Sequence, residues 1–203
     1  MKIICIGRNY VDHIRELNNA IPANPVFFLK PDTALLIRNR PFYYPAFSDN
    51  IHYEVELVLK ISKVGKNIQK RFAGDYYQEL SAGLDLTARD LQDSAKKDGL
   101  PWAIAKGFDQ SAPIGTFIPK SKFPDVKNIS FTLLLNGQPV QKGNSGLMIH
   151  DFDDIIVGIS KYMTIRTGDL IFTGTPAGVG PVKIGDHLEA FIEGEKLLSC
   201  AIK

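Results

Sequence analysis

The stretch IHYEVELV at 51–58 places two carboxylates, Glu54 and Glu56, in a strand-like alternation with apolar residues. Side chains at positions i and i+2 of a strand point to the same face about 7 Å apart, so both carboxylates can turn toward one cation. For an isolated Glu-x-Glu, a solvated strand face is the commoner explanation. His52 lies on the same face, which leaves open a His-x-Glu-x-Glu set that would suit a transition metal.

A third oxygen ligand is offered by Asp85 in SAGLDLTARDLQ, where an apolar run ends and a helix begins. The alternative for Asp85 is a plain N-cap of that helix. Three carboxylates without a cysteine favour a hard ion, Mg²⁺ or Mn²⁺, over zinc. An octahedral ion held by three protein ligands would keep three positions for substrate and water.

A second pair with chemical potential is His13 and Glu16 in DHIRE. At positions i and i+3 they are neighbours on a helix surface, and a carboxylate beside an imidazole fixes its tautomer and raises its basicity, as a general base requires. The alternative is an exposed helix with unremarkable charges. Lys106 ends the apolar run in PWAIAKGFDQ, and an ordinary surface lysine is the alternative there.

The Gly-rich loop TGTPAGVG at 173–180 follows the apolar run LIF. It lacks the Gly-Lys-Ser/Thr ending of a phosphate-binding loop, so a nucleotide site is not indicated. Thr hydroxyls and backbone N–H groups in such a loop are suited to binding a carboxylate. The sequence has no Gly-x-Ser-x-Gly elbow and no reactive-cysteine motif, so covalent hydrolysis is not supported.

Strands must position most of these groups. Strand patterns occur at KIICI, at VFFLK, along 51–61 and at DLIFTG, and hairpin turns are predicted at Asn136-Gly137 and Glu193-Gly194. Three helices are predicted, over 11–19, over 86–99 with Asp85 or Thr87 as N-cap and Gly99 as the stop, and from Asp151 onward. We therefore expect one mainly β domain over 1–203 with a few short helices.

Composition excludes several classes of partner. A net charge of +2 and a pI near 8.4 are too mild to indicate nucleic-acid binding, and 44% hydrophobic with 23% charged residues is ordinary for a globular protein. The longest apolar runs fall short of the ~18 residues of a membrane-spanning helix. Cys5 and Cys200 fit neither a disulfide framework nor a metal motif, which favours a reduced, cytoplasmic setting.

Along nearly its whole length the chain resembles the fumarylacetoacetate hydrolase (FAH) superfamily, and it is most similar to the branch with acylpyruvases and oxaloacetate decarboxylases. The matching stretches are IGRNYVDHIRE, FLKP, HYEVEL, DLTARDLQ, GLPWAIAKGFD, MTIRTGDLIFTGTPAGVGPV and IGDHLEA. The resemblance implies an α+β, mainly β fold with a mixed β-roll, a homodimer and a bound Mg²⁺ or Mn²⁺.

The resemblance also assigns roles to residues. It implies metal ligation by Glu54, Glu56 and Asp85, and it places the superfamily's lysine at Lys106. The His–Glu dyad of a short lid helix falls on His13 and Glu16. Three further positions match residues expected to line the substrate pocket, namely Arg8, Lys30 and Thr175.

The activity implied is cleavage of a C–C bond in small 2-oxo acids through a metal-stabilised enolate, as acylpyruvate hydrolysis, oxaloacetate decarboxylation or both. In hydrolysis, His13 oriented by Glu16 would activate water, whereas decarboxylation needs no nucleophile. An isomerase or hydratase acting on a hydroxymuconate-type dicarboxylate is an alternative, as is a non-catalytic metal- or ligand-binding domain.

Overall fold

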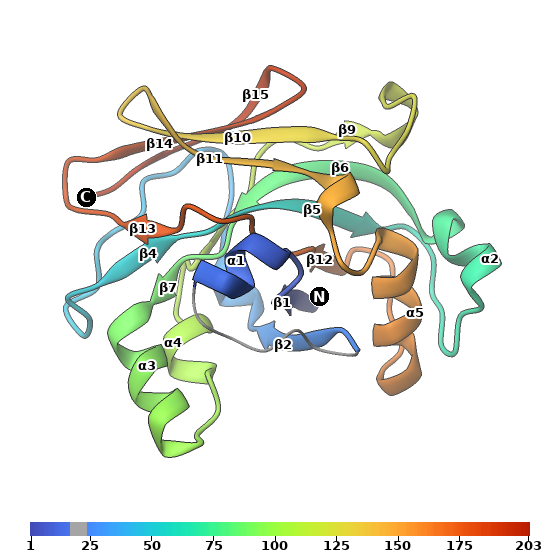
Figure 1. Cartoon of the computed structure of the whole chain (residues 1–203), viewed down its shortest axis with the longest axis horizontal. Coiled ribbons are helices and arrows are strands. Elements are labelled where there is room, and N and C mark those ends of the chain that lie inside the picture. Colours follow the sequence, from blue (N-terminus) through green and yellow to red (C-terminus); the bar gives the residue numbers. More distant parts are fainter. Residues whose placement is uncertain (17–23) are drawn as a thin grey trace.

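The computed structural model describes residues 1–16 and 24–203, and in these parts of the chain it is α+β with strands predominating. This confirms the predicted fold class. Most strands lie in two larger sheets, and the helices are short and lie around them (Figure 1).

The largest sheet of the described residues has six strands and is mixed. The second and third strands in its spatial order run parallel to each other, and every other neighbouring pair is antiparallel. In spatial order the strands are β2 (Val26–Lys30), β1 (Ile3–Gly7), β12 (Leu170–Phe172), β5 (Val55–Ile61), β6 (Tyr77–Leu84) and β9 (Ile118–Pro119). The pairing of β1 with β12 joins distant parts of the sequence in one sheet.

The predicted strand 51–61 is interrupted at Glu54. Before it lies β4 (Ile51–Tyr53), and after it β5 continues to Ile61. At the break the carbonyl of Glu54 accepts a hydrogen bond from the N–H of Asp85 at 2.8 Å, and the N–H of Val55 donates to Gln141 Oε1 at 2.9 Å. A loop and a side chain therefore replace a neighbouring strand at this point, and the chain passes from one sheet to another.

The second larger sheet is antiparallel and is built from two hairpins. It contains β11 (Gln138–Asn144), β10 (Ser130–Leu135), β14 (His187–Ile192) and β15 (Glu195–Ala201). Asn136 and Gly137 both have positive φ values, 52° and 80°, as a two-residue type I′ turn requires. Both predicted hairpins are confirmed.

Two small sheets complete the strand pairings. The first contains β13 (Gly180–Pro181), β4 and β7 (Thr87–Ala88), and the second contains β3 (Leu35–Leu36) and β8 (Ala112–Pro113). Short 3-10 turns occur at Asp32–Ala34, Gly74–Tyr76, Lys120–Lys122 and Ser145–Leu147.

The helices partly follow the predictions. They are α1 (Val11–Glu16), α2 (Lys70–Ala73), α3 (Arg89–Asp98), α4 (Ala103–Lys106) and α5 (Phe152–Tyr162). The rest of the first predicted helix, 17–19, lies outside the described residues. Gly99 ends α3 in a left-handed conformation, as predicted. The third helix was predicted to run from Asp151; α5 begins at Phe152, and Asp151 is its N-cap, accepting from Asp154 N–H. The N-cap of α3, however, is Ala88, so the predicted capping by Asp85 or Thr87 is wrong.

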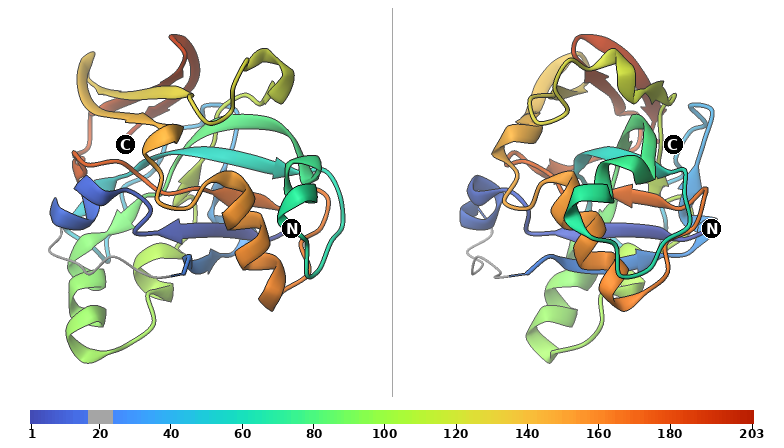
Figure 2. Two further views of the ribbon diagram at one scale, coloured as in Figure 1. Left: turned by 45° about the vertical axis from the view of Figure 1, so that its right-hand side comes forward. Right: turned by 90° about the vertical axis from the view of Figure 1, so that its right-hand side faces the viewer.

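The two larger sheets lie in layers. The sheet of β10, β11, β14 and β15 lies over the long strands β5 and β6, and α3 and α4 lie on the other side (Figures 1 and 2). The main apolar core fills the space between the layers, with Leu57, Leu80, Leu133 and Ala190 fully buried. Burial of β5 on both faces makes it a rigid base for the carboxylates at its start.

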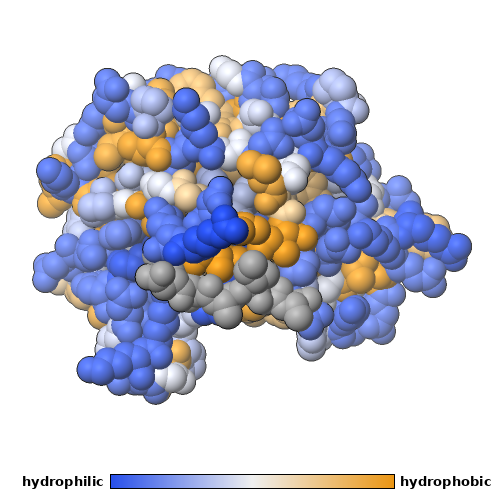
Figure 3. Space-filling view, in the orientation of Figure 1, coloured by the Kyte–Doolittle hydropathy of each residue, from blue (hydrophilic) through white to orange (hydrophobic). Residues whose placement is uncertain are grey.

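The face shown in Figure 3 is mostly hydrophilic, with smaller apolar patches between the polar side chains. Among the described residues, each helix is too short or too polar to cross a membrane.

Candidate active site

Three carboxylates meet at the junction of the strands. Glu54 lies at the β4–β5 break, Glu56 lies near the start of β5, and Asp85 follows β6. One oxygen of each lies within 4.8 Å of the others, and the residues are only 5%, 1% and 1% exposed. A solvated strand face is therefore the wrong explanation for the Glu-x-Glu pattern. Because Asp85 N–H binds the Glu54 carbonyl, the backbone itself holds two of the three together.

His52 does not join this cluster, although it precedes the same strand break. Its Nε2 lies 3.0 Å from Asn50 Oδ1, and the side chain is only half-buried. In the described parts of the chain, the group of three close ligand atoms consists of carboxylates alone. The alternative His-x-Glu-x-Glu set is therefore not formed.

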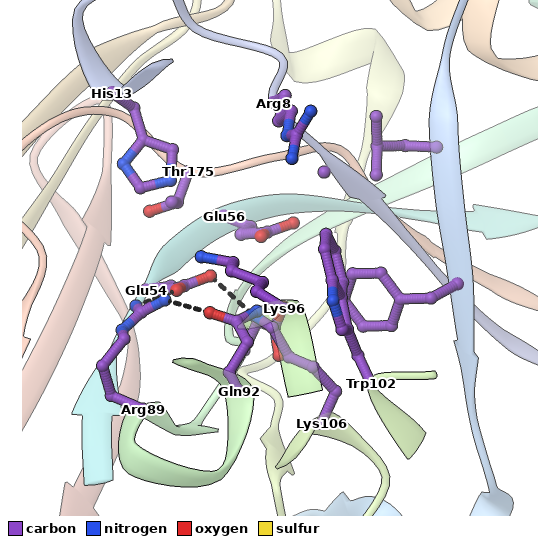
Figure 4. Close-up of a pocket in the computed structure, with 14 residues that line it drawn as sticks. Arg8, His13, Glu54, Glu56, Arg89, Gln92, Lys96, Trp102, Lys106 and Thr175 are labelled. Atoms are coloured by element: carbon purple, nitrogen blue, oxygen red, sulfur yellow. Dashed lines mark hydrogen bonds and ion pairs between the residues drawn. The ribbon is translucent and has the colours of Figure 1, made fainter. Parts of the chain in front are cut away.

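Buried cations surround the carboxylates. Lys106 Nζ lies 2.8 Å from Glu54 Oε2 and 2.7 Å from Asp85 Oδ2, and it donates to Thr87 Oγ1 at 2.6 Å (Figure 4). With three acceptors for its three N–H groups, Lys106 is a fixed part of the cluster and not a surface lysine. Arg89 forms an ion pair with Glu54.

Lys30 lies behind Asp85, away from the cavity. Its Nζ is 2.7 Å from Asp85 Oδ1 and also donates to the carbonyl and the hydroxyl of Ser111, each at 2.9 Å. The resemblance had suggested that Lys30 lines the pocket, but in the structure its ammonium is fully occupied by the protein. Its geometry supports Asp85 and offers no direct contact to a ligand.

The electrostatics of the carboxylates differ. Burial alone would raise the pKa of Glu54, but the charges of Lys106 and Arg89 outweigh burial and hold this pKa well below its ordinary value. For Glu56, burial and the charge of Asp85 raise the pKa well above its ordinary value. Glu56 is thus the carboxylate whose charge the protein compensates least.

The Gly-rich loop binds two carboxylates of the protein itself. Gly174 N–H donates to Glu56 Oε2 at 2.7 Å, and Gly178 N–H donates to Glu16 Oε1 at 3.0 Å. Gly174 has a φ of +102°, and a Cβ there would lie 2.7 Å from Asn9 Cβ, so only glycine fits. The loop also brings Thr175 to the cavity, where its hydroxyl accepts from Gln141 Nε2 at 2.9 Å.

The His13–Glu16 pair forms at the cavity mouth. His13 Nδ1 lies 3.1 Å from Glu16 Oε2, and His13 is buried although Glu16 is partly exposed. The exposed-helix alternative is therefore wrong for His13. Glu16 bridges the short helix α1 to the Gly-rich loop, so the imidazole is held from one side while its ring borders the cavity (Figure 4).

These groups line a cavity of about 40 Å³ that is open to the outside. One buried water molecule needs roughly 10–15 Å³ of such space, so the cavity has room for more than water and suits a small ligand. Of the predicted residues, all but Glu16 and Lys30 line it. Seven further lining residues were not predicted from the sequence, and these are Ile6, Gly7, Phe28, Arg89, Gln92, Lys96 and Trp102.

The three carboxylates fit a divalent cation. Oxygens on opposite sides of Mg²⁺ are about 4.2 Å apart, so a set within 4.8 Å needs only small adjustments. Glu56 accepts one neutral N–H and otherwise faces two other carboxylates, a repulsion that a cation among them would relieve. The donor set is all oxygen, as a hard ion prefers.

The sequence of the whole chain matches one family. The model of the family described as fumarylacetoacetate (FAA) hydrolase, C-terminal, matches residues 2–202. The chain belongs to this family. The resemblance deduced from the motifs is thereby confirmed.

Two curated relatives and one solved structure are similar over nearly the full length. The mitochondrial oxaloacetate tautomerase FAHD1 of Bos taurus is 46% identical over 95% of this chain and 87% of its own. The mitochondrial oxaloacetate decarboxylase of Dictyostelium discoideum is 46% identical over 95% and 89%. The fumarylpyruvate hydrolase of Pseudomonas aeruginosa, in complex with Mn²⁺ and pyruvate, has a TM-score of 0.94 at 35% identity, covering 100% of this chain and 89% of its own.

The predicted cytoplasmic setting is contradicted by these family members, because both curated relatives are mitochondrial proteins. The prediction relied on Cys5 and Cys200, which are indeed buried free thiols. Reduced cysteines indicate a reducing environment, but they do not distinguish one reducing compartment from another.

Proposed function

We propose that this protein acts on oxaloacetate, interconverting its keto and enol forms and decarboxylating it, with a divalent metal at Glu54, Glu56 and Asp85. The observation that carries the proposal is the convergence of three buried carboxylates beside a histidine–glutamate pair in one small cavity. The similarity to an oxaloacetate tautomerase and an oxaloacetate decarboxylase supports this choice of substrate.

We propose Mg²⁺ as the ion, with Mn²⁺ as a substitute, because the donor set is all carboxylate. Such an ion, when bound, supplies a Lewis acid for the carboxylate and keto oxygens of a 2-oxo acid and so favours its enolate form. The similarity to a hydrolase that binds Mn²⁺ and pyruvate supports this assignment.

Lys106 acts by position and charge. Its three N–H groups are directed at Glu54, Asp85 and Thr87, so a direct hydrogen bond to substrate would require breaking one of them. Instead it holds two ligands at a fixed separation, and its charge stabilises negative charge that develops in the cavity.

His13 moves the proton. With Nδ1–H directed to Glu16, the lone pair is on Nε2, and this nitrogen is the base. In the tautomerisation it takes the proton from carbon 3 of the keto acid and then returns it to the oxygen of carbon 2, so no net proton is gained or lost. Decarboxylation breaks a C–C bond instead, so it depends less on His13.

Hydrolysis of acylpyruvates is a second candidate. The same His13 and Glu16 would activate a water against the distal carbonyl, and the similarity to a fumarylpyruvate hydrolase favours this reaction.

We further propose that residues 1–203 form a single catalytic domain and that the active species is a homodimer, as the family resemblance implies. Light scattering of the purified protein at several concentrations tests the oligomeric state.

The direct test uses purified protein stripped with EDTA and then reloaded with Mg²⁺ or Mn²⁺. Enol–keto interconversion of oxaloacetate is followed by ultraviolet absorbance, pyruvate formation by chromatography, and acetylpyruvate cleavage in parallel. Free metal ions promote both oxaloacetate reactions, so each rate is corrected with metal alone. We expect the oxaloacetate activities to depend on reloading. Equal activity after stripping, or cleavage of acetylpyruvate alone, would refute the proposal.

A further inference from the structure

Helix α3 presents a polar stripe to the cavity. Arg89, Gln92 and Lys96 are spaced i, i+3 and i+7, so they share one helix face, and all three line the cavity. Arg89 and Gln92 are bound to each other, and Arg89 also pairs with Glu54. Lys96 differs from them, because its nearest carboxylate is that of exposed Asp93, 3.8 Å away.

Arg8 borders the same cavity from the segment between β1 and α1. Its backbone is left-handed, with a φ of +59°, a conformation that costs a non-glycine residue roughly 1–2 kcal/mol. Among the described residues, the Arg8 side chain forms no ion pair or side-chain hydrogen bond. Figure 4 shows Arg8 and Lys96 bordering the space next to Glu56 from different elements.

The charges around the cavity indicate what this space would bind. The three carboxylates are matched by three buried cations, Lys30, Arg89 and Lys106, while Lys96 and Arg8 add two more positive charges at the lining. A bound divalent ion increases the excess. Burial and the charge of Arg89, with a smaller effect from Arg8, lower the pKa of Lys96, so an anion placed between these groups relieves a real repulsion.

We propose that Lys96, together with Arg8, binds the second carboxylate of a 2-oxo dicarboxylate and thereby selects dicarboxylates over 2-oxo acids with an uncharged far end. The inference rests on the proposed function for the orientation of the substrate, whose first carboxylate lies at the three acidic residues. Lys96 is then a residue that determines specificity, and it takes no part in the bond-breaking step.

Malate and lactate are the probes. Both carry a 2-hydroxy-carboxylate head, neither is expected to react, and only malate has a second carboxylate. Their affinities for the Mn²⁺-loaded protein are measured by titration calorimetry in wild type, Lys96→Met and Lys97→Met. Methionine keeps the apolar stem without the charge, and Lys97 is the exposed neighbour on the same helix, so Lys97→Met is the matched control.

We expect wild type and Lys97→Met to bind malate more tightly than lactate. In Lys96→Met, malate affinity should fall about tenfold or more, as expected for a lost charge-assisted hydrogen bond, while lactate affinity stays within about twofold. In the turnover assay the preference for oxaloacetate over acetylpyruvate should fall by a similar factor through KM, with kcat little changed. Lactate binding also shows that the variant is folded.

Three results would overturn the inference: no preference for malate in wild type, an equal loss of malate and lactate binding in Lys96→Met, or the same loss in Lys97→Met. Because the probes do not turn over, the titrations examine this subsite even if oxaloacetate is not the substrate. Failure of the proposed function would appear in the turnover assay alone.

Discussion

Gly174 donates its backbone N–H to Glu56 Oε2 at 2.7 Å, and this is the one hydrogen bond to the Glu56 carboxylate among the described residues. The Gly-rich loop thus orients the carboxylate whose charge is least compensated. The sequence suggested that this loop binds a carboxylate, and in the structure it binds two carboxylates of the protein itself, those of Glu56 and Glu16.

Gly174→Ala should disturb both the fold and the metal site. The new Cβ would meet Asn9 Cβ at 2.7 Å, whereas Gly185, with a similar φ of +96°, has nothing within 4 Å. We expect Gly185→Ala to lower the free energy of unfolding by about 1–2 kcal/mol and Gly174→Ala to lose about 1–3 kcal/mol more, measured in urea. Only Gly174→Ala should weaken Mn²⁺ binding. Equal effects of the two substitutions would contradict the role assigned to Gly174.

His13→Ala separates proton transfer from ligand binding. Tautomerisation and any acylpyruvate hydrolysis should fall about 10²–10⁴-fold, the usual contribution of a general base, while decarboxylation is partly retained. Oxalate, which resembles the chelating head of the enolate, should bind nearly as in wild type. The control is Asp12→Ala, an exposed neighbour on α1. If oxalate affinity and turnover fell together in His13→Ala, His13 would be a binding or structural residue.

Lys106→Met should destabilise the metal-free protein by about 3–5 kcal/mol, because Glu54 and Asp85 lose a buried partner. Lys60→Met removes the ion pair with Glu79, which has a similar N···O distance, but both of these side chains are about 40% exposed. This substitution should therefore lower the free energy of unfolding by less than about 1 kcal/mol. Thermal unfolding with and without Mn²⁺ measures both. Since the ion replaces the lost positive charge, Mn²⁺ should raise Tm more in Lys106→Met than in wild type. A smaller rise would contradict the charge balance described for the cluster.

Alternation and turn residues are local signals, so the sequence alone predicted the main strands and the hairpin turns, whereas the joining of Asp85 to Glu54 and Glu56 was implied by the family resemblance. The break at Glu54 could not be predicted, since the hydrogen bonds that cause it come from Asp85 and Gln141, which are distant in the sequence. Asp85 was ambiguous for the same reason, because an N-cap and a ligand look alike until the start of α3 is known.

The cationic side of the site was only partly predicted. The i, i+3, i+7 spacing of Arg89, Gln92 and Lys96 is visible in the sequence, but it shows only that they share a helix face, not which face borders the cavity. Lys30 does end the predicted strand VFFLK, but its side chain turns behind Asp85 and binds Ser111, so it does not line the pocket as the resemblance implied. Direction of a long side chain depends on partners that local sequence does not reveal.

Glu56 is buried beside two other carboxylates at a cost to the metal-free fold, and a bound metal ion would offset this cost. Glu56→Gln preserves shape and can still accept from Gly174, but it removes the charge. Because burial and the charge of Asp85 raise the pKa of Glu56 well above its ordinary value, the stability of the metal-free fold falls as the pH rises above that ordinary value, near neutral pH included. The folded protein must there either retain the proton or bear an uncompensated charge.

The decisive measurement is therefore a calorimetric Mn²⁺ titration of wild type and Glu56→Gln, with Glu79→Gln, whose side chain is about 40% exposed, as control and with Tm recorded in EDTA. We expect wild type and Glu79→Gln to bind Mn²⁺, while Glu56→Gln should bind it at least about tenfold more weakly and yet unfold at a higher temperature in EDTA. Wild-type Mn²⁺ affinity in a folded Glu56→Gln protein would contradict the metal site and the function proposed for it.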